Sequence, residues 1–361
     1  MLSKTALLAS LFTSTIFLSG TAGAQPFQNP DSFSYQQTNL VTDTSGTAVT
    51  TDPNLIDPWG LAFQPNGAFW VNDKGTGVAT LYDGNGTKVQ KTFTIPSKAG
   101  ATGASSPTGL VWNPTQGFAV PGTQLTSVFL FATLQGTVAA WAPNLPTNPT
   151  DAVTAVDNSA KGAVYTGLAL GVNDRGAFLY AANVNSGKID VFNSSFQPAQ
   201  LSGTFSDPQV PAGFVPFGIH EVSGNLVVTY ARQNATKTFI TPSFGAGFVD
   251  IFDTNGQLLD RLASGGALNA PWGVALAPVG FGGVSGRILV GNFGDGHILA
   301  FDPARHSVDI LLDQNRFPIQ LPGLWELHFG GGAVSDPTTL YFTEGVASGQ
   351  HGLLGALTAL E

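Results

Sequence analysis

The chain contains no cysteine, a single methionine, and only 10% charged residues among its 361 positions. Without cysteine there are no disulfides, no thiolate nucleophile and no sulfur ligands for haem or iron–sulfur clusters. Lysine and arginine number 14 against 23 acidic residues, so we expect no nucleic-acid partner and no binding to anionic membrane. The chain must therefore be stabilised by a large core, for which it is long enough.

Long apolar runs are confined to the N-terminus. Lys4 precedes an apolar stretch from Ala6 to Leu18, and the small residues Ala22-Gly23-Ala24 follow. This order is typical of a signal peptide, here residues 1–24, and no later run reaches the roughly 20 apolar residues of a membrane helix. We expect an exported protein, periplasmic or extracellular, with residues 25–34 as an N-terminal extension.

Several catalytic motifs are also missing. The sequence has no glycine-rich loop followed by Lys-Ser/Thr, no Gly-x-Ser-x-Gly and no His-Glu-x-x-His. Nucleotide, serine-hydrolase and zinc-peptidase chemistries therefore have no support. What the chain has in abundance is glycine (45), proline (23) and phenylalanine (26), a mixture that favours many short strands joined by tight turns.

A six-residue segment with a central glycine recurs six times along the chain. Its first copy is Pro58-Trp59-Gly60-Leu61-Ala62-Phe63, and the glycine serves as a marker. Successive markers are 49, 58, 51, 55 and 53 residues apart, a regular spacing that indicates a repeat architecture. The markers are Gly60, Gly109, Gly167, Gly218, Gly273 and, in a degenerate sixth copy, Glu326.

Three more short strands follow each marker segment. In the first copy they are expected at Phe69–Val71, Gly77–Tyr82 and Lys88–Ile95. Four antiparallel strands repeated radially predict one all-β domain over residues 35–361, a six-bladed β-propeller. The last copy lacks a fourth strand, so we expect Tyr35–Val41 to supply it and close the ring.

Longer segments carry a more specific signal, namely Asn39–Val41, Asp57–Phe63, Gly75–Tyr82, Gly247–Asp253 and Val290–Gly296. Together they resemble a family of exported, NHL-repeat-like proteins of uncharacterised function, over a stretch from Tyr35 to the C-terminus. The resemblance implies a propeller and no particular activity. The chain departs from the family pattern at Glu326 and His328, and at Leu134-Gln135.

Oxygen-bearing side chains follow the second strands of several blades, where they would gather around one mouth of the central channel. They could surround a hard cation such as Ca²⁺. Gluconolactonase-like propellers use a comparable set, although the likeness is one of fold class. Alternatively, these residues occupy turns, which asparagine and aspartate favour. The candidate ligands are Asp73, Asn183, Asn292 and Glu344.

Two histidines occupy the same place in different repeats. His220 and His328 each lie two residues after their marker, and the sixth marker is itself Glu326. Because alternate residues of a strand share a face, we expect the three side chains to form one polar cluster at the axis. They could act in general acid–base catalysis. Alternatively, they form a hydrogen-bonded group that only packs between blades.

Three tryptophans lie where inner strands begin, at Trp59, Trp272 and Trp325. They could bind a sugar ring or a peptide at the channel mouth, or they could pack between blades. Our leading hypothesis is a monomeric binding protein for a small molecule, glycan or protein, without turnover. The alternative is a metal-assisted hydrolase or lyase, lactonase-like, working at the same mouth. The fold alone does not choose between them.

Overall fold

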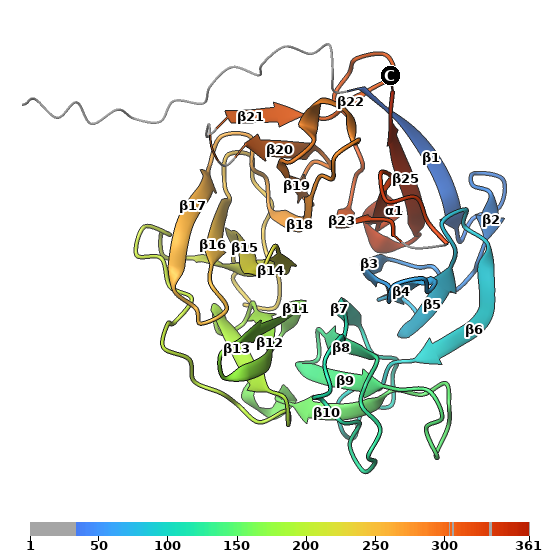
Figure 1. The fold of residues 1–361 in the computed structure, drawn as a ribbon, viewed down its shortest axis with the longest axis vertical. Coiled ribbons are helices and arrows are strands. Elements are labelled where there is room, and N and C mark those ends of the chain that lie inside the picture. The colour runs from blue at the N-terminus through green and yellow to red at the C-terminus, as the bar shows by residue number, and fades with distance from the viewer. Residues whose placement is uncertain (1–33, 303, 305–306, 332–333, 361) are drawn as a thin grey trace, which may run out of the picture.

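The computed structural model describes residues 34–302, 304, 307–331 and 334–360. The predicted signal peptide and all of the predicted extension but Ser34 lie outside these residues. Six small sheets form a ring around a central axis (Figure 1), so the predicted six-bladed β-propeller is confirmed. No helix within the described part is long and apolar enough to cross a membrane.

Four blades have four antiparallel strands each, running from an inner strand at the axis to an outer strand at the rim. Blade 1 comprises β3 (Pro58–Ala62), β4 (Phe69–Asp73), β5 (Val78–Tyr82) and β6 (Lys88–Thr94). Blade 2 comprises β7 (Pro107–Trp112), β8 (Phe129–Thr133), β9 (Thr137–Trp141) and β10 (Val153–Asp157). Blade 4 comprises β14 (Phe214–Val222), β15 (Asn225–Arg232), β16 (Phe248–Phe252) and β17 (Leu258–Ser264). Blade 5 comprises β18 (Pro271–Leu276), β19 (Ile288–Asn292), β20 (Ile298–Asp302) and β21 (Ser307–Ile310).

Blade 3 departs from the expected four strands. It consists of β11 (Tyr165–Asn173), β12 (Gly176–Asn183) and β13 (Lys188–Asn193). The following stretch makes a single bridge, between Phe192 and Pro198, instead of a fourth strand. Further prolines at positions 208 and 211 also lack the N–H that a strand ladder requires.

Blade 6 is built from both ends of the chain. β23 (Leu324–Phe329), β24 (Leu340–Glu344) and β25 (Leu353–Ala359) are followed by β1 (Ser34–Thr42), which pairs antiparallel with β25. The Tyr35 ring stacks on Phe281 with centroids 4.5 Å apart, and its hydroxyl donates to the Phe281 carbonyl. The predicted closure by the N-terminal strand is therefore confirmed. The short elements nearby are β2 (Thr50–Thr51), β22 (Leu312–Asp313) and α1 (Val346–Gly349), and 3₁₀ turns occur at Ser159–Lys161 and Gly282–Val284.

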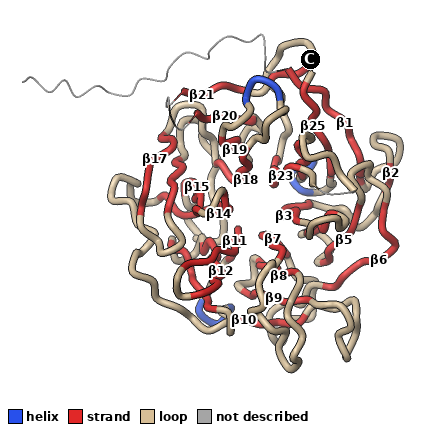
Figure 2. Tube along the Cα trace, in the orientation of Figure 1, coloured by secondary structure: helices blue, strands red, loops and turns tan. Residues whose placement is uncertain are grey.

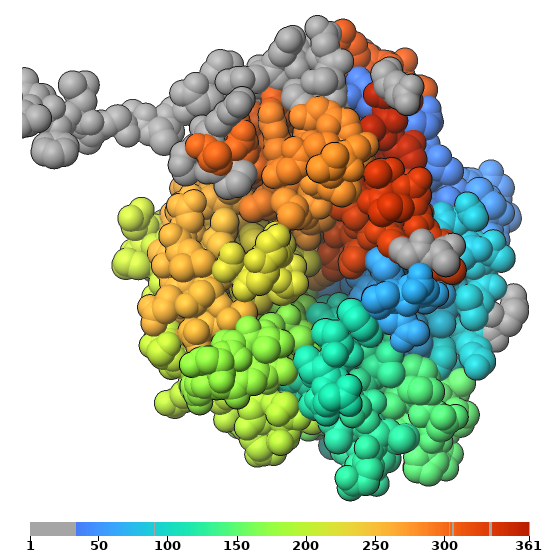
Figure 3. Space-filling model, in the orientation of Figure 1, coloured from blue at the N-terminus to red at the C-terminus, as the bar shows by residue number. Residues whose placement is uncertain are grey.

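The marker glycines let neighbouring blades meet at the axis. A Cβ atom on Gly60 would lie 2.4 Å from the Thr108 carbonyl oxygen of blade 2. One on Gly273 would lie 2.2 Å from the Trp325 carbonyl oxygen of blade 6. Figure 2 shows the inner strands gathered around the axis, and Figure 3 shows the blades packed side by side as sectors of one ring. A larger residue at these markers would push blades apart.

Candidate binding site at the propeller axis

The inner strands all begin at one face of the ring, here the start face, and end at the opposite face, the end face. The residues just before the markers of blades 1, 5 and 6 are Trp59, Trp272 and Trp325, all buried. The rings of Trp59 and Trp325 stack with centroids 3.5 Å apart, and Trp272 lies 6.1 and 5.5 Å from them. With Phe217 of blade 4, they form an aromatic plug across the axis near the start face.

The indole N–H groups of the plug have polar partners. The Asp57 carboxylate accepts hydrogen bonds from Nε1 of Trp59 at 3.2 Å and of Trp325 at 3.3 Å, and its other oxygen pairs with Lys74 at 2.7 Å. Trp272 Nε1 donates to a backbone carbonyl. Of the two alternatives for these tryptophans, their burial favours packing between blades over binding at an open mouth. The ring of blades is so narrow that the indoles fill the axis and present no free face to a ligand.

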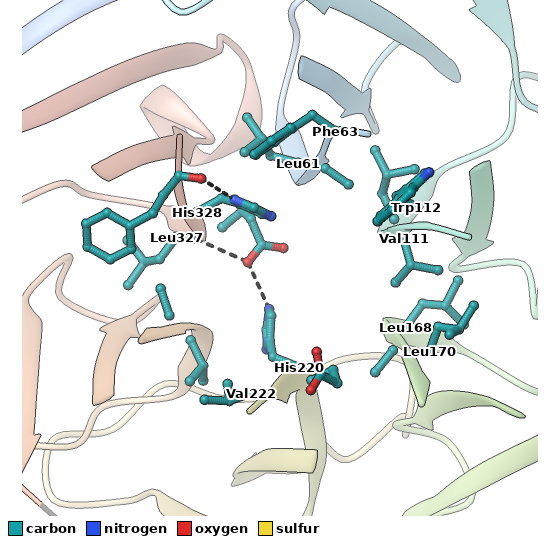
Figure 4. Close-up of a pocket in the computed structure, with 18 of the residues that line it drawn as sticks. Leu61, Phe63, Val111, Trp112, Leu168, Leu170, His220, Val222, Leu327 and His328 are labelled. Carbon is teal, nitrogen blue, oxygen red and sulfur yellow. Dashed lines mark hydrogen bonds and ion pairs between the residues drawn. The ribbon is translucent and has the colours of Figure 1, made fainter. Parts of the chain in front are cut away.

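A cavity of about 550 Å³ occupies the axis on the other side of the plug. The inner strands of all six blades line it (Figure 4), and most of its lining side chains are apolar. Pro65, Pro114 and Ser223, which follow inner strands, form part of its rim. The cavity thus opens at the end face, whereas we expected the site at the start face. The apolar wall includes Leu61, Val111, Leu168, Leu170, Val222 and Leu327.

One side of this cavity is polar. His220 of blade 4 reaches Glu326 of blade 6, with 2.9 Å between Nε2 and Oε1. The same Oε1 accepts the Leu327 N–H at 3.2 Å, and no described residue bonds to Oε2. The Glu326 N–H donates to the Thr343 hydroxyl at 3.0 Å, which fixes the backbone at this marker. Glu326 therefore has one oxygen in use and one available to a ligand.

His328 lines the same cavity beside the pair. Its Nδ1 lies 2.7 Å from the Phe329 carbonyl oxygen, and since a carbonyl only accepts, Nδ1 carries the proton. Burial lowers the pKa of His328 below its ordinary value, so the ring is neutral at pH 7. In a neutral ring protonated at Nδ1, Nε2 is an acceptor. No described residue hydrogen-bonds to this atom, and Phe63 packs against the ring with centroids 5.0 Å apart.

The structure thus brings His220, Glu326 and His328 together at the axis, and their catalytic role stays a hypothesis. His220 Nδ1 is buried without a hydrogen-bond partner among the described residues. Sequence reasoning missed the aromatic rim of the cavity. Its signal was present, because Phe63, Trp112 and Phe329 all lie three residues after a marker and all line the cavity.

The four candidate metal ligands are not brought together. Each is the last residue of a second strand in a different blade, and the side chains of three are bonded to a neighbouring strand or loop. Asp73 accepts from the Thr80 hydroxyl at 2.7 Å, Asn183 donates to Asp190, and Asn292 donates to the Ala267 carbonyl. Glu344 lines a separate cavity. Across the described residues, no group of three or more His, Asp or Glu side chains could hold a metal ion. The predicted metal site of Asp73, Asn183, Asn292 and Glu344 therefore has no support from these contacts.

Fold and cavity together define a six-bladed β-propeller with a largely apolar pocket on its axis. No protein-family model matches the chain. The chain is 33% identical over 353 residues to an uncharacterised protein of Acanthamoeba polyphaga mimivirus, a match that covers 94% of this chain and 85% of that protein. A second uncharacterised mimivirus protein is 29% identical over 356 residues, covering 94% and 91%. The chain belongs to the family of these uncharacterised proteins.

Solved structures resemble the chain in fold. The PQQ-bound aldose sugar dehydrogenase of Streptomyces coelicolor superposes with a TM-score of 0.53 at 15% identity, covering 91% of this chain and 99% of that one. A catalytically inactive virginiamycin B lyase of Staphylococcus aureus with quinupristin gives 0.50 at 13%, covering 91% and 100%. A putative gluconolactonase gives 0.50 at 13%, covering 90% and 92%. At these identities the likeness shows the propeller fold alone.

Proposed function

We propose that the axial cavity binds a small molecule with an apolar body and one hydrogen-bond donor, such as a hydroxyl group. The observation that carries this proposal is the pair of acceptors, Glu326 Oε2 and His328 Nε2, on one side of an otherwise apolar cavity. A few polar groups in an apolar pocket of several hundred cubic ångströms are typical of small-molecule sites.

The chemistry of the polar side limits the ligand. An anionic head group would face the Glu326 carboxylate, and no described lysine or arginine lines the cavity to offset that repulsion. A head group without a donor would remove water from two acceptors and leave them unpaired, which is unfavourable. A hydroxyl donor satisfies one of them, and a primary amine, which has two N–H groups, can satisfy both. The apolar body would then contact the leucine and valine side chains of the wall.

Phenol and methoxybenzene test the proposal because they share a ring and differ in one donor. We expect phenol to bind more tightly, by roughly 10- to 100-fold if it donates to the Glu326 carboxylate. Titration calorimetry on the wild-type chain measures both affinities. The Glu326→Gln variant should lose most of the preference for phenol. Glu221→Gln serves as the matched control, since Glu221 lies exposed at the rim of the same cavity.

The proposal fails if phenol and methoxybenzene bind equally well to the wild-type chain. It also fails if Glu326→Gln and Glu221→Gln have the same effect. Binding of benzoate in preference to phenol would contradict the argument from charge.

A second candidate, acid–base catalysis, is favoured by the unprotonated Nε2 of His328. This nitrogen could take a proton from a water that attacks an ester or lactone carbonyl. The acyl–oxygen bond then breaks, and Nε2 returns the proton to the departing alkoxide oxygen, which gives an acid and an alcohol or, from a lactone, a hydroxy acid. Phenyl acetate extends the ligand series and releases phenol on hydrolysis. Release by the wild-type chain no faster than by His328→Gln would leave binding without turnover as the function.

A further inference from the structure

A second cavity, of about 330 Å³, lies where the two ends of the chain meet in blade 6. Gln37 and Asn39 of β1 form one wall, and Gln320, in the connection to β23, forms another. Glu344, at the end of β24, and His351 also line it, together with three threonines and three apolar residues. The cavity is separate from the axial one, and the two share no lining residue.

Glu344 is unusual among the buried acids of this chain. Among described residues, eight aspartates and glutamates are buried, and seven of them have a hydrogen-bond or ion-pair partner. Glu344 is only 6% exposed, and no described residue forms a hydrogen bond or ion pair with its carboxylate. Burial of a carboxyl without a partner is costly, and it raises the pKa of Glu344 to about 7. A bound ligand that supplies the missing partner would remove this cost.

The remaining lining indicates what that ligand is. Six of the eleven lining residues carry an amide or hydroxyl group, and Leu321, Val346 and Leu353 form an apolar part that suits the alkyl chain of an amine. Within the part of the chain that the structure describes, no lysine or arginine lines the cavity, which makes an anion unfavourable next to Glu344. A calcium ion takes six to eight oxygen ligands, usually with several carboxylates. Among the described lining residues, Glu344 is the only one with a carboxylate. The nearby Asp43 is already bonded to His351 Nδ1 at 2.7 Å.

We propose that this cavity binds a primary ammonium group, with the Glu344 carboxylate as its counter-ion. An ammonium group has three N–H donors, so one can meet Glu344 while the others meet the amide and hydroxyl oxygens of the lining. Because the walls come from β1 and from the segment between β24 and β25, the ligand would also hold the ring closure together.

Butylammonium chloride is the probe, and tetramethylammonium chloride is its partner with the same charge and no N–H donor. We expect butylammonium to raise the melting temperature of the full chain at pH 8, as a ligand specific for the folded state does. Tetramethylammonium, glucose and calcium chloride should produce smaller shifts. Glu344→Gln should abolish the shift, whereas Glu221→Gln, at the other cavity, should keep it.

Loss of binding in Glu344→Gln must be separated from loss of folding. A carboxyl whose pKa is raised on folding destabilises the protein once it ionises, that is, as pH rises through 7. Glu344→Gln should therefore melt no lower than the wild-type chain at pH 8.

The pH dependence of binding tests the proposal on the wild-type chain, without a substitution. The titratable groups facing the cavity are Glu344 and His351, the latter paired with Asp43. Affinity for butylammonium should fall below pH 7, approaching roughly tenfold per pH unit, as Glu344 takes up its proton. The fall should persist in His351→Gln. Equal binding of tetramethylammonium, a larger shift with calcium or glucose, or a flat pH profile would each overturn the proposal.

Discussion

Asp57 holds the aromatic plug with a single carboxylate, which meets two indole N–H groups and the Lys74 ammonium. We expect Asp57→Asn to lower the free energy of unfolding by about 1–3 kcal/mol, because charge-assisted hydrogen bonds to a buried group are lost. Asparagine tolerates the positive φ of 48° at this position, so the backbone is not the cause. Urea denaturation measures the change.

Asp174→Asn is the control for this substitution. Asp174 is exposed, and a surface change of this kind stays within about 0.5 kcal/mol. If Asp57→Asn is no less stable than Asp174→Asn, the carboxylate does not hold the plug.

The positions of individual side chains could be predicted where the same offset from the marker recurs in different repeats. The grouping of His220, Glu326 and His328 followed from their offsets to the markers. The burial of Trp59 and Trp272 did not follow, because a linear repeat does not give the width of the ring. The tautomer of His328 depends on its bond to the Phe329 carbonyl, a contact that only the folded chain shows.

Strand β1 completes blade 6, so its removal tests the closure of the ring. Tyr35, Leu40 and Val41 are buried there, and burial of each such side chain is worth roughly 1.5–3 kcal/mol. A chain lacking residues 1–42 should melt at a lower temperature and self-associate through the unpaired edge of β25. Light scattering and thermal unfolding measure both effects.

Removal of residues 1–33 alone is the matched control, because it leaves β1 in place. It should behave like the full chain in both measurements. A monomeric chain without residues 1–42, melting as the control does, would show that β1 does not stabilise the ring.

The strands expected after the first marker were predicted to within two residues. The expected strand at Lys88–Ile95 is β6 (Lys88–Thr94), and Phe69–Val71 extends to become β4. The missing fourth strand of blade 3 was not foreseen, because we extended the pattern of the other blades to it. Prolines at positions 198, 208 and 211 mark that stretch as a poor strand. In blade 3, these prolines prevent the fourth strand that the repeat pattern predicts.

At the scale of the whole molecule, the ring depends on close contact between inner strands. We expect Gly273→Ala to lower the free energy of unfolding by about 1–3 kcal/mol or more, because the new methyl meets the Trp325 carbonyl of the next blade. Gly103→Ala is the control, since no atom lies within 4 Å of a Cβ built there. Chemical denaturation of both variants measures the difference. Equal stability would mean that the blades can separate without cost.

The aromatic plug also determines the route by which a ligand enters and leaves the axial cavity. With the axis filled by Trp59, Trp272 and Trp325, the described residues close the cavity at the start face, and it opens at the end face. A ligand must leave by the way it came, and a second cannot follow until the first has gone. Anything seated over that opening, including a partner protein, would therefore trap an occupant already inside and exclude one outside.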